Sequence, residues 1–194
     1  MARPPRWHHT LGPEARWVLA HGCATDVVAP LQALPPDRWT HLLVDVAAHR
    51  LEGLLVHAVA TDALPVTAAQ AEDVAHIEVD LTHARVWQEQ RLVDVVDRVE
   101  AAGVDVRVLK GLALATLDYP DPQMRPTGDV DLLVRAADLD RVGAVLAAGG
   151  ATRTDPDPRP GYAALVGKGA TWADDRGEVD LHRLLVWGDR KSVV

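Results

Sequence analysis

Through the first hundred positions of the chain, apolar residues recur at intervals of three and four. This spacing predicts helices over residues 14–33, 39–58 and 67–102. Pro35-Pro36 is expected to end the first helix, and Gly53 to divide the second in two. This stretch contains no recognisable catalytic constellation, so residues 1–102 are expected to form a helical region that packs on the rest of the chain.

Two of these helices carry residues suited to their first turns. Asp37 and Thr67 have side-chain oxygens that can accept a hydrogen bond from a helical N–H group, so both are predicted N-caps. The apolar stripes assign the following residues to the core: Trp17, Val18, Val27, Val28, Leu31, Leu42, Val46, Leu55, Val74, Trp87, Val95, Val96 and Val99.

The pattern changes after Gly103, where short alternating runs replace the helical stripes. Alternation predicts strands over residues 104–109 and 129–134, and each strand is followed by a helix, over residues 112–117 and 137–148. Residues 169–174 and 178–186, joined by Asp175-Arg176-Gly177, predict a β-hairpin. Strands that alternate with helices indicate a mixed α/β domain over residues 103–194, and the whole chain is therefore expected to have an α+β fold.

The second of these strands carries two carboxylates. Val130, Leu132 and Val134 alternate with Asp129 and Asp131, so the apolar side chains face one way and both acids the other. Carboxylates this close repel each other by about 1–4 kcal/mol, and a cation or a shared proton usually offsets such repulsion. From these residues alone, a solvated acidic face on an edge strand remains the alternative.

Residues before and after this strand favour an active site. Glu178, Asp180 and His182 share one face of the last strand, and if that strand lies beside the 129–134 strand, Asp180 joins the acidic pair. Three converging carboxylates suit two Mg²⁺ ions about 3.5–4 Å apart.

Lys110-Gly111 stands where a strand passes into a helix, which brings N–H groups and the positive helix end to a loop. Glu178 and His182 are expected to be supporting polar neighbours.

Composition narrows the classes of function. A formal net charge of −8 argues against a general nucleic-acid or anionic-membrane binder. The single cysteine, Cys23, allows no internal disulfide and is expected to be a small buried residue in a reducing compartment. The N-terminus lacks the apolar segment of a secretory signal, and no run approaches the ~18 apolar residues that span a bilayer. We therefore expect a soluble cytoplasmic protein.

The ordered motifs of the second half resemble those of the polymerase-β-type nucleotidyltransferase superfamily, and most closely its uncharacterised bacterial branch. The matching motifs are Lys110-Gly111, Arg125-Pro126-Thr127-Gly128-Asp129-Val130-Asp131-Leu132-Leu133-Val134 and Val179-Asp180-Leu181-His182. They cover roughly residues 103–186. The resemblance implies a polymerase-β-like sheet and a Mg²⁺-dependent enzyme that moves a nucleoside monophosphate from an NTP to an acceptor hydroxyl, with release of pyrophosphate.

The resemblance also implies roles for individual residues. Asp129 and Asp131 would bind both metal ions, and Asp180 would bind the catalytic metal and help to activate the acceptor hydroxyl. The backbone at Gly111 and Gly128 would approach the triphosphate, although Leu112 stands where the wider superfamily commonly has serine. Basic side chains suited to neutralising phosphate charge are those of Lys110 and Arg125.

The end of the sequence motivates two alternatives. Val194 follows the last expected strand by only eight residues, whereas members of this branch generally continue with helices that build the acceptor pocket. One alternative is a shortened, non-catalytic relative that binds or regulates. The other is a truncated fragment in which the free edge of the Glu178–Val186 strand pairs with a second copy in a homodimer. The acceptor is left open between a small molecule, a peptide, a protein and an RNA.

Overall fold

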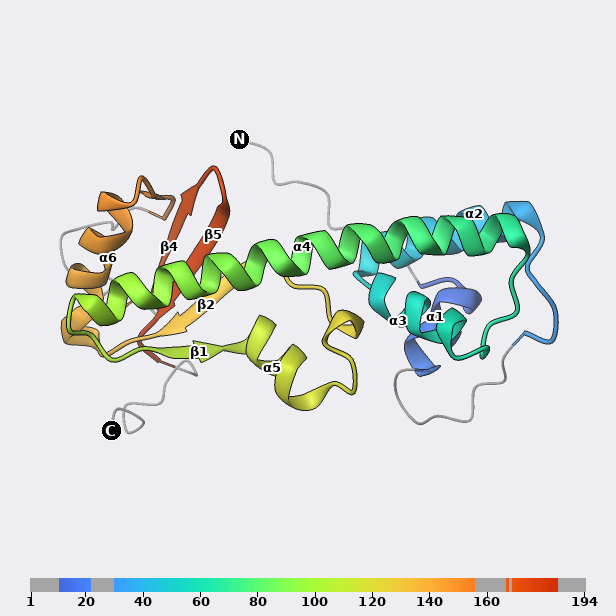
Figure 1. Cartoon of the computed structure of the whole chain (residues 1–194), viewed down its shortest axis with the longest axis horizontal. Coiled ribbons are helices and arrows are strands. Elements are labelled where there is room, and N and C mark those ends of the chain that lie inside the picture. Colours follow the sequence, from blue (N-terminus) through green and yellow to red (C-terminus); the bar gives the residue numbers. More distant parts are fainter. Residues whose placement is uncertain (1–10, 22–29, 156–166, 168, 185–194) are drawn as a thin grey trace. The chain divides into compact units, whose positions relative to one another are not determined.

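A computed structural model describes residues 11–21, 30–155, 167 and 169–184 (Figure 1). The chain divides into two compact units. The first comprises Met1–His83 with Gln123–Pro126, and the second comprises Ala84–Pro122 with Thr127–Val194. The long helix α4 (Ala68–Ala101) contributes residues to both. Within the described ranges, no helix is both long and apolar enough to cross a membrane.

The first unit is helical. Its short helices are α1 (Pro13–His21), α2 (Pro36–His49) and α3 (Glu52–Ala60), and each of them contacts the other two. The predicted division of the second helix is confirmed, but it lies at Arg50, whose φ of 56° is left-handed. Gly53 remains inside α3, where a Cβ atom would collide with the carbonyl oxygen of Gln123. Glycine is therefore needed at position 53 for close packing of the backbone.

Three predictions in this unit are wrong. Residues 30–33 are not helical, and Leu31 is 92% exposed instead of buried. Pro30 offers a reason, since proline lacks the N–H group of a helix interior and disfavours helix in the residue before it. Asp37 lies within the first turn of α2 and does not cap it, because Pro36 takes the first helical position. Cys23, Val27 and Val28 lie outside the described residues.

Helix α4 starts as predicted. Thr67 and Gln70 form a capping box, in which the Gln70 N–H donates to Thr67 Oγ1 at 3.3 Å and the Thr67 N–H donates to Gln70 Oε1 at 3.0 Å. The assignment of Trp87 to the core is wrong, because its side chain is 50% exposed. The buried face of α4 in the second unit is instead formed by Gln88, Arg91, Val95 and Val99, at intervals of three and four.

The second unit is built on a five-stranded sheet of order β1-β2-β5-β4-β3 (Figure 1). Its strands are β1 (Arg107–Leu109), β2 (Asp129–Leu133), β3 (Thr152–Arg153), β4 (Gly169–Asp174) and β5 (Gly177–His182). Strands β2 and β5 are parallel, and the other three pairs are antiparallel. The α+β prediction is confirmed, and so is the hairpin, now formed by β4 and β5.

The strand positions correct two expectations. The short β3 was not predicted. The free edge expected for the last strand does not exist, because β5 pairs with β2 on one side and with β4 on the other. It ends at His182 and not at Val186; residues 183 and 184 belong to no strand, and residues 185 and 186 lie outside the described ranges. Within the described residues the sheet ends at β1 and β3, so the edge expected to support a homodimer is already paired.

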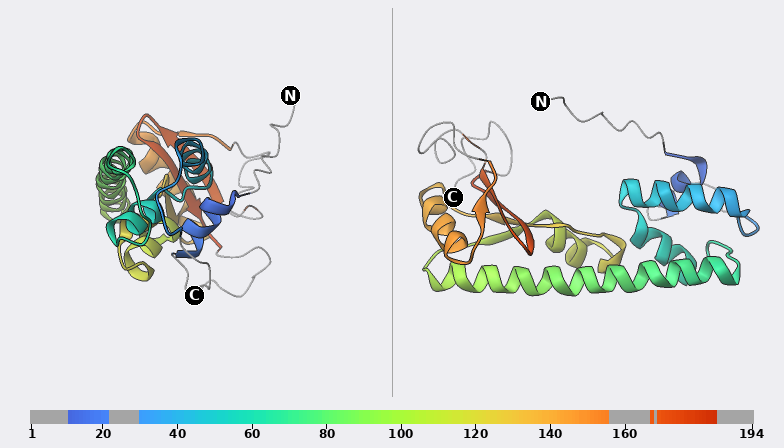
Figure 2. Two further views of the ribbon diagram at one scale, coloured as in Figure 1. Left: turned by 90° about the vertical axis from the view of Figure 1, so that its right-hand side faces the viewer. Right: turned by 90° about the horizontal axis from the view of Figure 1, so that it is seen from above.

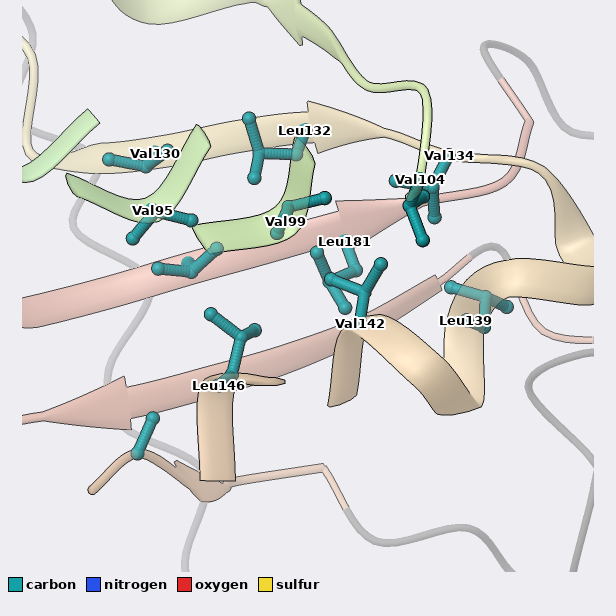
Figure 3. Close-up of a cluster of buried hydrophobic side chains, with 12 residues drawn as sticks. Val95, Val99, Val104, Val130, Leu132, Val134, Leu139, Val142, Leu146 and Leu181 are labelled. Atoms are coloured by element: carbon teal, nitrogen blue, oxygen red, sulfur yellow. The ribbon is translucent and has the colours of Figure 1, made fainter. Parts of the chain in front are cut away.

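One face of the sheet is covered by helices. The connecting elements are α5 (Lys110–Asp118), the 3-10 turns Pro122–Met124 and Ala136–Asp138, and α6 (Leu139–Ala148). Val130, Leu132 and Leu181 point toward α4 and α6, where they join one apolar cluster (Figure 3). Figure 2 shows α6 and the C-terminal part of α4 against the strands. The predicted alternation of β2 is confirmed, so its acidic side chains lie on the face away from this core.

Candidate metal and nucleotide site

The pairing of β2 with β5 brings the acidic residues of both strands together. In the parallel register, Asp131 lies opposite Asp180, with Asp129 opposite Glu178. The intervening residues Val130 and Val179 are both 1% exposed and belong to the core. Side chains alternate between the faces of a sheet, so the carboxylates of Asp131 and Asp180 share the face away from the helices. The neighbouring strands that the sequence argument required are therefore present.

Asp131 is the most tightly held of these acids. Asp131 is 4% exposed, and its Oδ1 accepts a hydrogen bond from Lys110 Nζ at 2.6 Å. His182 Nε2 lies 2.7 Å from the same oxygen and 3.4 Å from Lys110 Nζ. Burial raises the pKa of Asp131, but the hydrogen bonds and charges of Lys110 and His182 outweigh it, so the net pKa is lowered. Asp131 is therefore held as a carboxylate.

A third residue completes a set of metal-ligand type. One ligand atom each from Asp131, Asp180 and His182 lie within 4.8 Å of one another. Asp180 Oδ1 is buried and has no hydrogen-bond partner among the described residues. A buried carboxylate oxygen without a partner is costly unless a cation or water satisfies it. Two carboxylates and an imidazole are suitable ligands for a divalent cation, so the residues fit a metal site.

From the sequence, His182 is expected only to be a supporting polar neighbour of the acids. It is 7% exposed, and it ends β5 two residues after Asp180 on the same face. The spacing of two residues between Asp180 and His182 was the signal in the sequence that both side chains share one face. Asp129 lies on the same face as Asp131, at the start of β2, and is half-buried. Glu178, its partner across the strands, is exposed.

Lys110 reaches Asp131 because of the way in which β1 ends. Leu109 is the antiparallel partner of Asp131 in the neighbouring strand, and Lys110 follows it directly. The φ angle of Lys110 is +39°, in the left-handed region, and the helix is kinked at Gly111. A Cβ atom at Gly111 would lie 3.5 Å from the side chain of Thr127, at ordinary contact distance. The Lys110-Gly111 turn thus packs against Thr127, in the segment that leads into β2.

The other two sequence candidates have different surroundings. The carbonyl oxygen of Gly128 accepts a hydrogen bond from Gln88 Nε2 of α4 at 3.0 Å, which fixes the backbone immediately before Asp129. Arg125 belongs to the first unit, where its Nε is buried without a hydrogen-bond partner among the described residues. Its contact with phosphate accordingly stays a prediction from the sequence.

Arg91 on α4 is a supporting residue that the sequence pattern did not predict. It is 1% exposed, and its guanidinium donates to Asp174 Oδ1 at 2.6 Å and to the carbonyl oxygen of Gly177 at 2.9 Å. These bonds attach the β4–β5 turn to the helix and so help to place β5. The available signal was the position of Arg91, three residues after Gln88 and four before Val95, which places a basic residue on the buried face of α4.

Comparison with known proteins agrees with the motifs. A family model described as "Uncharacterised nucleotidyltransferase" matches residues 35–193. That range includes all three motifs and also most of the helical residues that precede them. No curated protein matches the sequence. Because the family match spans well over half of the chain, and because the acids of its strand motifs meet on one face of the sheet, the chain belongs to the uncharacterised nucleotidyltransferase family.

Proposed function

We propose that this protein is a metal-dependent nucleotidyltransferase, which moves a nucleoside monophosphate from an NTP to an acceptor hydroxyl. The observation that carries the proposal is the parallel register of β2 and β5, which sets Asp131 beside Asp180 on the face away from the core. Membership of the family supports the class of reaction. Residues 103–194 form the proposed nucleotidyltransferase domain, and residues 1–102 its helical region.

The proposed metal ligands are Asp129, Asp131 and Asp180, with His182 beside them. Ligand atoms of Asp131, Asp180 and His182 lie within 4.8 Å of one another, and the buried oxygen of Asp180 lacks another partner among the described residues. Asp129 is proposed from the sequence motif and from its place on the same face of β2. We propose two Mg²⁺ ions, which would neutralise the charge on the triphosphate and on the oxygens around the reacting phosphorus.

The chain's own side chains have separate tasks in the proposed reaction. The acceptor oxygen forms a bond to the α-phosphorus, the bond from that phosphorus to the bridging oxygen breaks, and pyrophosphate leaves. The proton of the acceptor hydroxyl passes to the carboxylate of Asp180 and then to solvent. Lys110, Gly111 and Gly128 are proposed to hold the phosphates, the glycines through close approach of the backbone and Lys110 through its charge. A phosphate contact by Arg125 is proposed from the sequence motif alone.

Calorimetry with each of the four NTPs in the presence of Mg²⁺ tests the binding part of this proposal. The wild type is expected to bind at least one NTP, and the Asp129→Asn and Asp131→Asn variants are expected to bind it at least about tenfold more weakly, because each loses a charged ligand. Asp97→Asn, which changes an exposed carboxylate on α4, is the matched control and should bind like the wild type. Equal binding by all of these proteins would refute the site.

Transfer is tested separately, with NTPs labelled on the α-phosphate and a cell extract as the source of acceptors. An enzyme leaves the label on a small molecule, a peptide, a protein or an RNA end, and fractionation of the extract identifies which. Transfer should depend on Mg²⁺ and be lost in Asp180→Asn. Binding of NTPs without any transfer would instead support a non-catalytic relative with a binding or regulatory role.

A further inference from the structure

The ammonium group of Lys110 lies among the atoms that form the candidate metal site. Lys110 Nζ is 2.6 Å from Asp131 Oδ1 and 3.4 Å from His182 Nε2, and both of these residues belong to the set of three candidate ligands. A lysine contact of this kind is distinct from the phosphate-neutralising role that the sequence suggested for the same residue.

An ammonium and a divalent cation cannot both make full use of Asp131 Oδ1. His182 and Lys110 already approach this oxygen at hydrogen-bond distance, and a carboxylate oxygen has two lone pairs to share. Two cations within a few ångströms of each other also repel strongly in a partly buried site. A metal ion that takes Oδ1 of Asp131 must therefore displace Lys110 or His182 from it, and repulsion between the two cations makes Lys110 the one to leave.

The surroundings determine which of the two side chains yields. Asp131 lies on β2 between β1 and β5, and its side chain is only 3% exposed. The Lys110 side chain is 50% exposed and projects from the turn at the start of α5, beside the kink at Gly111. A long, half-exposed side chain can adopt other rotamers at little cost, whereas a buried carboxylate on a central strand cannot.

We propose that Lys110 and a divalent cation compete for Asp131, and that the metal releases the Lys110 ammonium to bind the phosphates of the nucleotide. Metal binding and nucleotide binding are thereby coupled through one side chain. The competition stands on the contacts of Lys110 alone, while the phosphate contact rests on the proposed nucleotidyltransferase function. Lys110 is then a resident cation of the site when the metal is absent and a phosphate ligand when it is present.

The competition is tested by titration of the full-length protein with Mn²⁺ in the absence of nucleotide, followed by electron paramagnetic resonance. Lys110→Met removes the competing charge at similar length, and we expect Mn²⁺ to bind about tenfold more tightly than to the wild type. Lys110→Arg keeps a positive charge and should stay within about threefold of the wild type. Arg141→Met, which removes an exposed charge on α6, controls for the change in net charge and should leave the affinity unchanged.

Unchanged or weaker Mn²⁺ binding in Lys110→Met overturns the competition. Circular dichroism identifies a variant that fails to fold, and Lys110→Gln, which is shorter and polar, then provides the same comparison. Loss of Mn²⁺ binding in Asp131→Asn is expected in either background, and its retention there would place the ion elsewhere and also overturn the proposal.

The phosphate contact is tested at saturating Mn²⁺, with an NTP that the wild type binds. Lys110→Met should bind this NTP about tenfold more weakly, so one substitution strengthens metal binding and weakens nucleotide binding. Equal NTP affinity at saturating metal overturns the phosphate contact. If the wild type binds no NTP while Lys110→Met still binds Mn²⁺ more tightly, the nucleotidyltransferase function fails and the competition stands.

Discussion

Arg91 and Asp174 form a partly buried ion pair across 83 positions of sequence, with Arg91 Nη1 2.6 Å from Asp174 Oδ1. The pair joins α4 to the turn of the β4–β5 hairpin, and the carbonyl oxygen of Gly177 accepts a second bond from the same guanidinium. Because β5 also carries Asp180, this contact helps to position the candidate site without being part of it. Removal of the pair should therefore lower the stability of the second unit more than it changes the activity of the site.

Arg91→Met is expected to destabilise the protein by about 2 kcal/mol, since it removes the charge-assisted hydrogen bonds of a buried guanidinium to Asp174 and to the Gly177 carbonyl oxygen. The free energy of unfolding from urea titrations measures this. Arg85→Met on the same helix breaks the more exposed pair with Glu89 and serves as control, with an expected loss below about 0.5 kcal/mol. Equal losses in the two variants would show that burial of the Arg91 pair contributes nothing.

The same pair predicts a dependence of stability on pH. Burial raises the pKa of Asp174, but hydrogen bonds from Arg91 and from the backbone of Arg176, with their charges, outweigh it and lower the pKa overall. A group with a lowered pKa stabilises the folded state fully above its unfolded pKa of about 3.9, and this contribution is lost as the pH falls through the folded value. Stability should therefore fall with acidification from about pH 5.

Urea titrations between pH 3 and pH 6, on the wild type and on Asp174→Asn, measure the contribution of this one group. The variant lacks the titrating carboxyl, so its stability should be lower at pH 6 and should fall less steeply toward pH 3. Parallel curves for the two proteins would assign the acid sensitivity to other carboxyls.

Gln88→Ala is expected to loosen the backbone before β2, because the Gln88 amide donates to the carbonyl oxygen of Gly128 at 3.0 Å. The loss of one buried hydrogen bond costs about 1 kcal/mol. Hydrogen exchange at residues 127–131 should become faster in this variant. Gln90→Ala changes an exposed glutamine two positions further along α4 and should leave exchange in this segment as it is in the wild type.

Gly53→Ala should destabilise the first unit, although alanine is the better helix former by about 1 kcal/mol. A Cβ atom at this position would collide with the carbonyl oxygen of Gln123 and would lie 2.7 Å from Met124 Cα. Overpacking against backbone typically costs about 1–3 kcal/mol. Thermal unfolding decides the sign: a lower melting temperature is expected, and a higher one would mean that close packing does not determine the residue at position 53.

Local patterns were sufficient to predict most of the elements. The start of α4 followed from Thr67, and the alternation of β2 placed Val130 and Leu132 in the core. Both depend on residues near each other in sequence, where side-chain periodicity and capping act directly. Predictions failed where the burial of a residue depends on contacts with segments far away in the sequence. Trp87 was assigned to the core, but the buried face of α4 includes Gln88 and Arg91 beside the predicted Val95 and Val99.

The sequence by itself determined the α+β class, the family motifs and the faces on which Asp131 and Asp180 point, because these depend on spacing along one segment. Only the tertiary structure decided that β5 also pairs with β2, that Asp180 therefore lies beside Asp131, and that Lys110 donates to the Asp131 carboxylate. A strand's periodicity states which side chains share a face but not which strand is its neighbour. That choice is made by hydrogen bonds and packing between segments far apart in the chain.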